Sequence, residues 1–168
     1  MSPRPTGRRG TRGEQDRLVL ERTFAAPVEA VWAAVTESER LARWIGTWTG
    51  DPATGSVALL MNAEGDDVRP QTFTILACEP PRLLELTAGA EGGEEGWHLL
   101  LELDEHDGST TLTFSQFVSD AETAAGVGPG WEYYLDRLVA AETGGDVAAV
   151  DFDDYHPAQG DHYRSLFA

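Results

Sequence analysis

The side chains with the chemistry to bind a metal gather near the C-terminus. They form the segment Asp151-x-Asp153-Asp154-x-His156, followed by Asp161-His162. An EF-hand loop that starts at Asp151 would need Gly at its sixth position and Glu at its twelfth, and the chain has His156 and His162 there. A zinc site built from His156, Asp161 and His162 is the alternative. We interpret the segment as a solvated acidic tail and predict no metal.

Catalytic motifs are weaker still. The sequence contains neither G-x-S-x-G nor H-E-x-x-H. Cys78 precedes Pro80-Pro81 and is expected to be a small buried residue. Glu85 is the candidate general base if it faces a cavity, but its strand parity is ambiguous. The run Gly126–Gly130 is not a dinucleotide fingerprint and follows a helical stretch, so we expect a hinge there. We therefore predict no catalytic residue and no cofactor.

Large apolar side chains give a stronger signal. They are either an ordinary core or the lining of a pocket, and pockets are mostly apolar with a few polar groups. Candidate polar groups inside the pocket are Arg43, Gln116 and Tyr134, although Gln116 could lie at a strand end and Tyr134 at the rim. The predicted ligand-binding residues are Trp44, Trp48, Met61, Phe73, Trp97, Phe114, Gln116, Trp131 and Tyr134.

Composition limits the partners and the compartment. The formal net charge is −17 and Cys78 is the sole cysteine, so no internal disulfide forms and a reducing cytoplasm is expected. Five Arg side chains lie within residues 1–17, so the rest of the chain is more acidic than the whole. Such a surface repels phosphate backbones, which argues against nucleic acid. No run approaches the ~18 apolar residues of a membrane span.

The hydrophobic pattern predicts the elements that position these residues. A strand at 18–24 precedes two short helices, at 28–35 and from 36 to 45. Strands are expected near Trp48 and at 56–62, 68–77, 82–88, 96–105 and 110–118, and a long amphipathic helix at 131–143. This order is α+β: a curved antiparallel sheet whose apolar face is covered by the last helix.

We expect the chain to divide into a flexible leader, residues 1–16, one domain, residues 17–145, and a tail, residues 146–168. The leader is rich in Arg, Gly and Pro and has the composition of a disordered segment. The tail contains too many aromatic residues to stay free, and we expect it to pack on the domain with Phe152 and Tyr155 as anchors.

Three segments resemble the START-like (SRPBCC) superfamily. Residues 24–36, FAAPVEAVWAAVT, resemble its opening, and Leu41-Ala42-Arg43-Trp44 resembles the segment after its first helix. Residues 130–138, GWEYYLDRL, resemble the start of the long helix in a bacterial branch, the homologues of the activator of heat shock protein 90 ATPase. The resemblance implies a helix-grip fold with a cavity between sheet and helix, and it allows for a homodimer.

Relatives with this fold carry many functions, so the resemblance leaves function open. We expect a binder of an apolar or aromatic small molecule, lipid- or polyketide-like, without catalysis. The alternatives are a cyclase-, aromatase- or hydrolase-like enzyme on a polyketide-type substrate, and a chaperone-cofactor or protein-interaction module. Paired titratable groups in the cavity would favour the enzyme.

Overall fold

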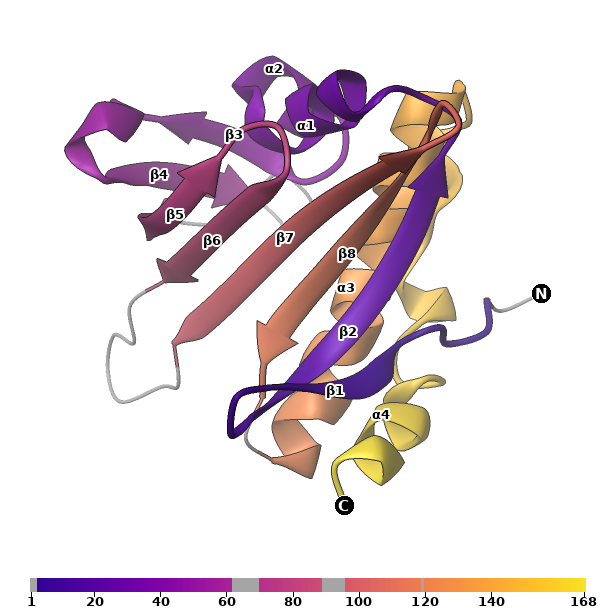
Figure 1. The fold of residues 1–168 in the computed structure, drawn as a ribbon. Helices are drawn as coiled ribbons and strands as arrows, with labels where there is room; N and C mark the ends of the chain where they lie inside the picture. Colours follow the sequence, from indigo (N-terminus) through magenta and orange to yellow (C-terminus); the bar gives the residue numbers. More distant parts are fainter. Residues whose placement is uncertain (1–2, 62–69, 89–95, 119) are drawn as a thin grey trace.

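An eight-stranded antiparallel sheet curves around one long helix (Figure 1). The structure is a computed structural model that describes residues 3–61, 70–88, 96–118 and 120–168. Its strands are β1 Arg8–Arg12, β2 Gln15–Phe24, β3 Gly46–Thr49, β4 Ser56–Met61, β5 Gln71–Glu79, β6 Leu83–Ala88, β7 Trp97–His106 and β8 Ser109–Phe117. They lie side by side in the order β1-β2-β8-β7-β6-β5-β4-β3. Residues 62, 68 and 69, where strand ends were expected, lie outside the described residues.

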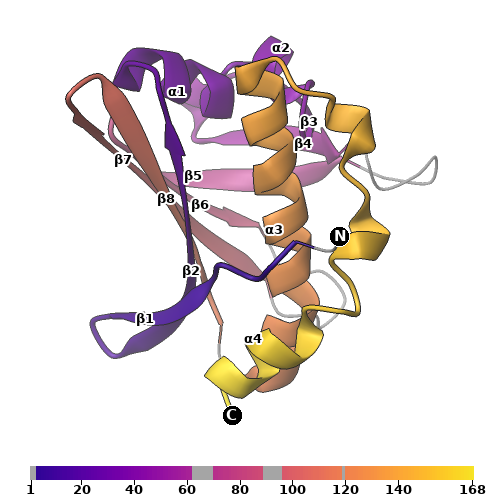
Figure 2. The same ribbon diagram turned by 90° about the vertical axis from the view of Figure 1, so that its right-hand side faces the viewer.

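The helices lie on one side of this sheet. They are α1 Val28–Thr36, α2 Ser38–Leu41, α3 Ala121–Thr143 and α4 Gly160–Leu166, with the short 3₁₀ turns η1 Pro52–Thr54, η2 Val147–Ala149 and η3 Phe152–Asp154. Figure 2 shows α3 crossing the concave side of the sheet, with α1 and α2 at one end of the sheet. The tail lies on the side of α3 that faces away from the sheet. The predicted α+β helix-grip fold is confirmed; the two short helices, expected after the first strand, follow β2, because β1 precedes the strand that was predicted first.

The β7–β8 hairpin shows how the pattern becomes structure. Leu99, Leu101 and Leu103 alternate along β7 and are buried on the inner face. Asp107 and Gly108 have φ of 52° and 80°, the positive values that a tight hairpin turn with the strands' own twist requires. The turn sets the register, so Leu101 lies opposite Phe114 and Leu99 opposite Gln116.

The long helix passes through the expected hinge at Gly126–Gly130, and this prediction is wrong. The helix begins after Asp120, whose carboxylate accepts a hydrogen bond from the Thr123 N–H at 2.7 Å, and ends at Gly144 with φ of 77°. A Cβ at Gly128 would lie 2.4 Å from the Tyr163 ring, so glycine lets the tail pack directly on the helix. This tertiary contact outweighs the low helix propensity of glycine and proline.

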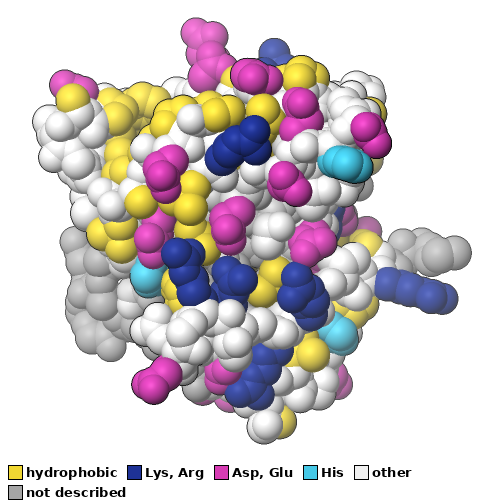
Figure 3. Space-filling model, in the orientation of Figure 1, with side chains coloured by type: hydrophobic (Ala, Val, Ile, Leu, Met, Phe, Trp, Pro, Cys, Tyr) yellow, Lys and Arg dark blue, Asp and Glu magenta, His cyan; other side chains and the backbone are white. Residues whose placement is uncertain are grey.

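Residues 8–12 of the leader form strand β1, where the sequence predicted a flexible segment over residues 1–16. Strand β1 pairs with β2, with Arg8 opposite Val19. Two arginines of β1 form ion pairs with β2: Arg8 with Glu21 at 2.8 Å and Arg9 with Asp16 at 2.6 Å. Figure 3 shows Arg side chains interspersed with acidic ones on the outer face of the sheet. Strand pairing and ion pairing together order a segment whose composition favoured disorder.

The tail packs along α3. Tyr155 and Tyr163 are 4% and 0% exposed, and the Tyr155 hydroxyl donates a hydrogen bond to Asp136 at 2.6 Å. Phe152, expected to be an anchor, is 41% exposed, although its ring lies 5.5 Å from that of Tyr133. The main anchors are therefore the two tyrosines.

A buried ion pair joins the leader, the sheet and α3. Glu132 is 1% exposed and contacts Arg22 of β2 at 2.9 Å. It also accepts hydrogen bonds from the backbone N–H of Thr6, at 2.6 Å, and from the Thr6 hydroxyl. Arg22 binds Asp136 as well, at 3.1 Å.

Within the described part of the chain, every helix is too short or too polar to serve as a membrane span.

Candidate functional site

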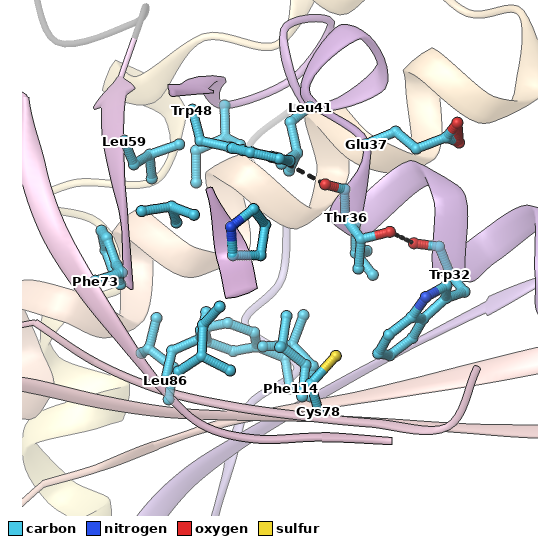
Figure 4. Close-up of a pocket in the computed structure, with 18 of the residues that line it drawn as sticks. Trp32, Thr36, Glu37, Leu41, Trp48, Leu59, Phe73, Cys78, Leu86 and Phe114 are labelled. Carbon is cyan, nitrogen blue, oxygen red and sulfur yellow. Dashed lines mark hydrogen bonds between the residues drawn. The ribbon is translucent and has the colours of Figure 1, made fainter. Parts of the chain in front are cut away.

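A cavity of about 410 Å³ lies between the inner face of the sheet and helices α1 and α2. The close-up in Figure 4 shows Trp48, Leu59, Phe73, Leu86 and Phe114 arranged around it. The sheet, the turn after β5, η1 and α3 contribute Trp48, Pro52, Val57, Leu59, Phe73, Ile75, Cys78, Pro80, Leu84, Leu86, Trp97, Leu99, Leu101, Phe114 and Trp131. The α1–α2 segment contributes Trp32, Val35, Thr36, Glu37, Leu41, Trp44 and Ile45. The volume of the cavity is in the range of small-molecule sites.

Several polar atoms of this lining are hydrogen-bonded within the protein. The indole N–H of Trp44 donates to the carbonyl of Ala34 at 3.0 Å, and that of Trp48 to the carbonyl of Thr36 at 2.7 Å. The Thr36 hydroxyl donates to the Trp32 carbonyl at 2.7 Å. The carboxylate of Glu37, the one acidic group of the described lining, points away from the other labelled side chains in Figure 4. The cavity therefore presents mostly carbon to its contents.

The solvent-exposed residues of the lining mark the opening of the cavity. They are Glu37, Pro52, Cys78 and Pro80, between α1–α2 and the end of β5. Cys78, expected to be buried, is exposed. A bulge in β5 explains why it lines the cavity, because the register shifts between Ile75 and Ala77 and so reverses the alternation beyond that point.

Most of the predicted ligand-binding residues lie around this cavity. Trp44, Trp48, Phe73, Trp97, Phe114 and Trp131 belong to its lining. Met61 and Tyr134 do not, and line a second cavity of about 290 Å³ instead, which Trp97 and Trp131 also border. Arg43 is exposed and belongs to neither lining.

Gln116 lies on the inward face of the sheet but belongs to the lining of neither cavity. It is 2% exposed, and its side-chain oxygen accepts a hydrogen bond from the indole N–H of Trp131 at 2.6 Å. Trp131 also packs on Phe114, with ring centroids 4.4 Å apart. Gln116 of β8 therefore fixes the orientation of the Trp131 indole through this hydrogen bond.

Glu85 lies on the outer face of the sheet. Its neighbours Leu84 and Leu86 line the cavity, so the intervening side chain points the other way. There Glu85 meets the Nε2 of His98 at 2.6 Å, and the His98 ring lies 4.3 Å from that of Phe117. A general base in the cavity is not provided by Glu85.

Sequence reasoning missed much of the aliphatic lining. Val57 and Leu59 of β4 and Leu84 and Leu86 of β6 alternate along their strands. That alternation was the available signal, because residues two apart share a face of a sheet. It does not tell whether the shared face is packed or hollow.

The two histidines of the zinc alternative, which the sequence analysis did not favour, have other neighbours. His156 stacks on Phe152, with ring centroids 5.7 Å apart, and the Nε2 of His162 lies 2.9 Å from the carbonyl oxygen of Gly7. Among the described residues, no group of three or more His, Cys, Asp or Glu side chains is arranged to hold a metal ion.

Comparison with known proteins gives a family and a set of similar structures. Residues 25–142 match the family model of Activator of Hsp90 ATPase homolog 1-like protein. The crystal structure of CalU16 from Micromonospora echinospora is 26% identical, with a TM-score of 0.75 over 96% of both chains. The protein encoded by gene BPP1335 of Bordetella parapertussis is 26% identical, with a TM-score of 0.67 over 94% of this chain and 95% of that one.

One more distant structure shares the fold. DynU16, described as a putative protein in the dynemicin biosynthetic locus, is 24% identical, with a TM-score of 0.65. The alignment covers 78% of this chain and 49% of DynU16. Among curated proteins, no sequence matches this chain.

Proposed function

Because this chain belongs to the family of Activator of Hsp90 ATPase homolog 1-like proteins, we propose that it binds an apolar or aromatic small molecule, lipid- or polyketide-like, in the larger cavity. The observation that carries the proposal is the chemistry of the lining. The cavity holds about 410 Å³, yet the indole N–H groups of Trp44 and Trp48 are hydrogen-bonded to backbone carbonyls behind it. A space that offers carbon surfaces selects a ligand by shape and apolar area.

Binding is a better account of this lining than catalysis. General acid–base chemistry needs positioned titratable side chains in contact with the substrate. Of the described lining residues only Glu37 is acidic, and it lies at the solvent-exposed opening. The His98–Glu85 pair lies on the opposite face of the sheet from the cavity. We therefore prefer a binder to a cyclase- or hydrolase-like enzyme.

The similar structures support a link to natural-product chemistry only in outline. DynU16 is described as a protein of the dynemicin biosynthetic locus, and its likeness to this chain is one of fold. A lipid and a polyketide both satisfy the apolar lining. A cytoplasmic location and a homodimer stay predictions.

The test fills the cavity from one strand and uses the other face of the same strand as control. Leu59 of β4 lines the cavity, whereas its neighbour Leu60 is 40% exposed and lies outside the lining. We expect the neutral dye N-phenyl-1-naphthylamine to bind the wild-type chain with enhanced fluorescence. Leu59→Trp should weaken that binding at least about tenfold, while Leu60→Trp should change it less than about twofold.

Two results would overturn the proposal. One is a wild-type chain that leaves the fluorescence of the dye unchanged. The other is equal affinity in the wild-type chain and a folded Leu59→Trp variant, whose fold circular dichroism would verify. Either result would mean that the cavity is not where apolar molecules bind.

A further inference from the structure

The second cavity adjoins the first across two indole rings. It has a volume of about 290 Å³. Trp97 and Trp131 line both cavities, and their ring centroids lie 5.5 Å apart at an interplanar angle of 67°. The lining of the second cavity is Met61, Trp97, Gly126, Val127, Gly130, Trp131, Tyr133, Tyr134 and Phe152. The two indoles therefore separate two neighbouring spaces.

Aromatic rings continue as the wall of the second cavity. Tyr134 lies 6.0 Å from Trp131 at 54°, and Tyr133 lies 5.1 Å from Tyr134 at 63°. Phe152 follows, 5.5 Å from Tyr133 at 78°. Each ring is strongly tilted against the next, so the series turns around a concave space instead of closing into a flat stack. Such walls give edge and face contacts to a further aromatic ring.

Two glycines of α3 open the helix side of this cavity. Gly128 is required by the close approach of Tyr163, whereas a Cβ built at Gly126 or Gly130 would have no described neighbour within 4 Å outside its own stretch of helix; Gly126 is exposed and Gly130 is half-buried. These glycines are four residues apart and so lie on one face of the helix. Glycine is the least favourable residue in a helix interior apart from proline. Packing against described neighbours does not require either glycine, and both border the second cavity, where they expose backbone.

We propose that the second cavity is a binding subsite for a planar, uncharged aromatic group, which lies on the α3 backbone at Gly126 and Gly130. Its described lining contains no charged side chain, and the Arg137 guanidinium already lies 5.3 Å from the centroid of the Tyr133 ring. A cationic group is therefore disfavoured. Because Trp97 and Trp131 border both cavities, the subsite extends the binding site of the proposed function and rests on it.

Met61 provides a local reporter for this subsite. It is 8% exposed and lines the second cavity but not the first, and the chain has only two methionines, Met1 and Met61. The probe is 2-naphthol, a small planar uncharged aromatic. With methyl-labelled methionine, we expect its ring current to shift the Met61 methyl resonance in a saturable titration.

Substitutions at the glycines separate this subsite from the larger cavity. Gly130→Leu should abolish the Met61 shift, because the added side chain occupies the cavity. Thr143→Leu, at an exposed position in the last turn of the same helix, should leave it intact. Leu59→Trp blocks the larger cavity and should also leave it intact. Gly130→Ala should raise the melting temperature by about 2–4 °C, since alanine is the better helix former and the space is free.

Each outcome decides between the two proposals. An absent Met61 shift in the wild-type chain, an unchanged shift in Gly130→Leu, or a lower melting temperature in Gly130→Ala would overturn the subsite. If the Met61 shift follows this pattern while N-phenyl-1-naphthylamine binds Leu59→Trp as tightly as the wild-type chain, the subsite stands and the larger cavity is not the binding site. If instead Leu59→Trp weakens dye binding while the Met61 shift is absent or unaffected by Gly130→Leu, the larger cavity is the binding site and the subsite is refuted.

Discussion

Removing the buried Arg22 should destabilise the fold far more than removing an exposed arginine. Arg22 and Glu132 are 11% and 1% exposed at the side chain, and their charged atoms lie 2.9 Å apart. Burial alone would lower the pKa of Arg22, but the hydrogen bond to Glu132 and the charge of Asp136 raise it overall. The guanidinium therefore stays charged in the folded protein and compensates two carboxylates.

The magnitude follows from what Arg22→Met leaves behind. Glu132 would stay buried with neutral donors, those of Thr6 and the Tyr163 hydroxyl, in place of a cation, and breaking a buried pair in this way costs about 3–5 kcal/mol. For a chain of 168 residues this corresponds to a fall in melting temperature of roughly 6–20 °C. Arg8→Met is the matched control, because the Arg8–Glu21 pair is exposed and such pairs contribute about 0–1 kcal/mol.

A double-mutant cycle tests whether the two residues act as a unit. Arg22→Met with Glu132→Leu removes both charges, so it should cost less than the two single substitutions added together, by about 1–3 kcal/mol. Urea unfolding followed by circular dichroism gives the four free energies of unfolding. The prediction is refuted if Arg22→Met costs no more stability than Arg8→Met. It is also refuted if the effects of Arg22→Met and Glu132→Leu simply add, because the two residues would then not act as a pair.

Two further predictions concern the tail. The pKa values of Tyr155 and Tyr163 are raised, chiefly by burial and then by the carboxylates of Asp136 and Glu132 respectively. Both rings are thus bound in their neutral form, so their contribution is complete below the unfolded tyrosine pKa of about 10 and is lost as the pH rises beyond it. Melting temperatures measured from pH 8 to 11 should fall towards alkaline pH, less steeply in Tyr163→Phe, and parallel curves would contradict this. Truncation after Gly145 removes both rings and should lower the melting temperature and increase the binding of an apolar dye; an unchanged melting temperature would show that the tail contributes nothing.

The strands and the last half of α3 could be predicted because their signals are local. Alternation in Trp97–Leu103 fixes which side chains face inwards, and Asp107-Gly108 fixes the turn that follows. Strand pairing of the leader could not be predicted in the same way. The leader is also held by contacts such as that of Thr6 with Glu132, which forms only when residues far apart in the sequence meet.

The candidate site was predictable in kind but not in detail. Six of the predicted aromatic residues line the larger cavity because bulky apolar residues on inward faces were the right signal. The position of Cys78 depends on one inserted residue in β5, and a bulge leaves no periodic signature. Gln116 was recognised as a polar residue on an inward face, but its partner Trp131 belongs to another element. Likewise, the continuity of α3 depends on Tyr163, more than thirty residues further along the chain.

The two sides of α3 explain how a domain with such cavities holds its shape. Empty space beside the sheet forfeits packing that a filled core would supply, so stabilisation must come from elsewhere. On the side of α3 away from the cavities, Tyr163 packs onto Gly128, and Glu132 binds Arg22 and the leader. These contacts fix the helix without placing a side chain in either cavity. Trp131 is thereby held against Gln116 as the boundary between the two spaces, and the leader and the tail, the least regular parts of the sequence, position the wall of the binding site.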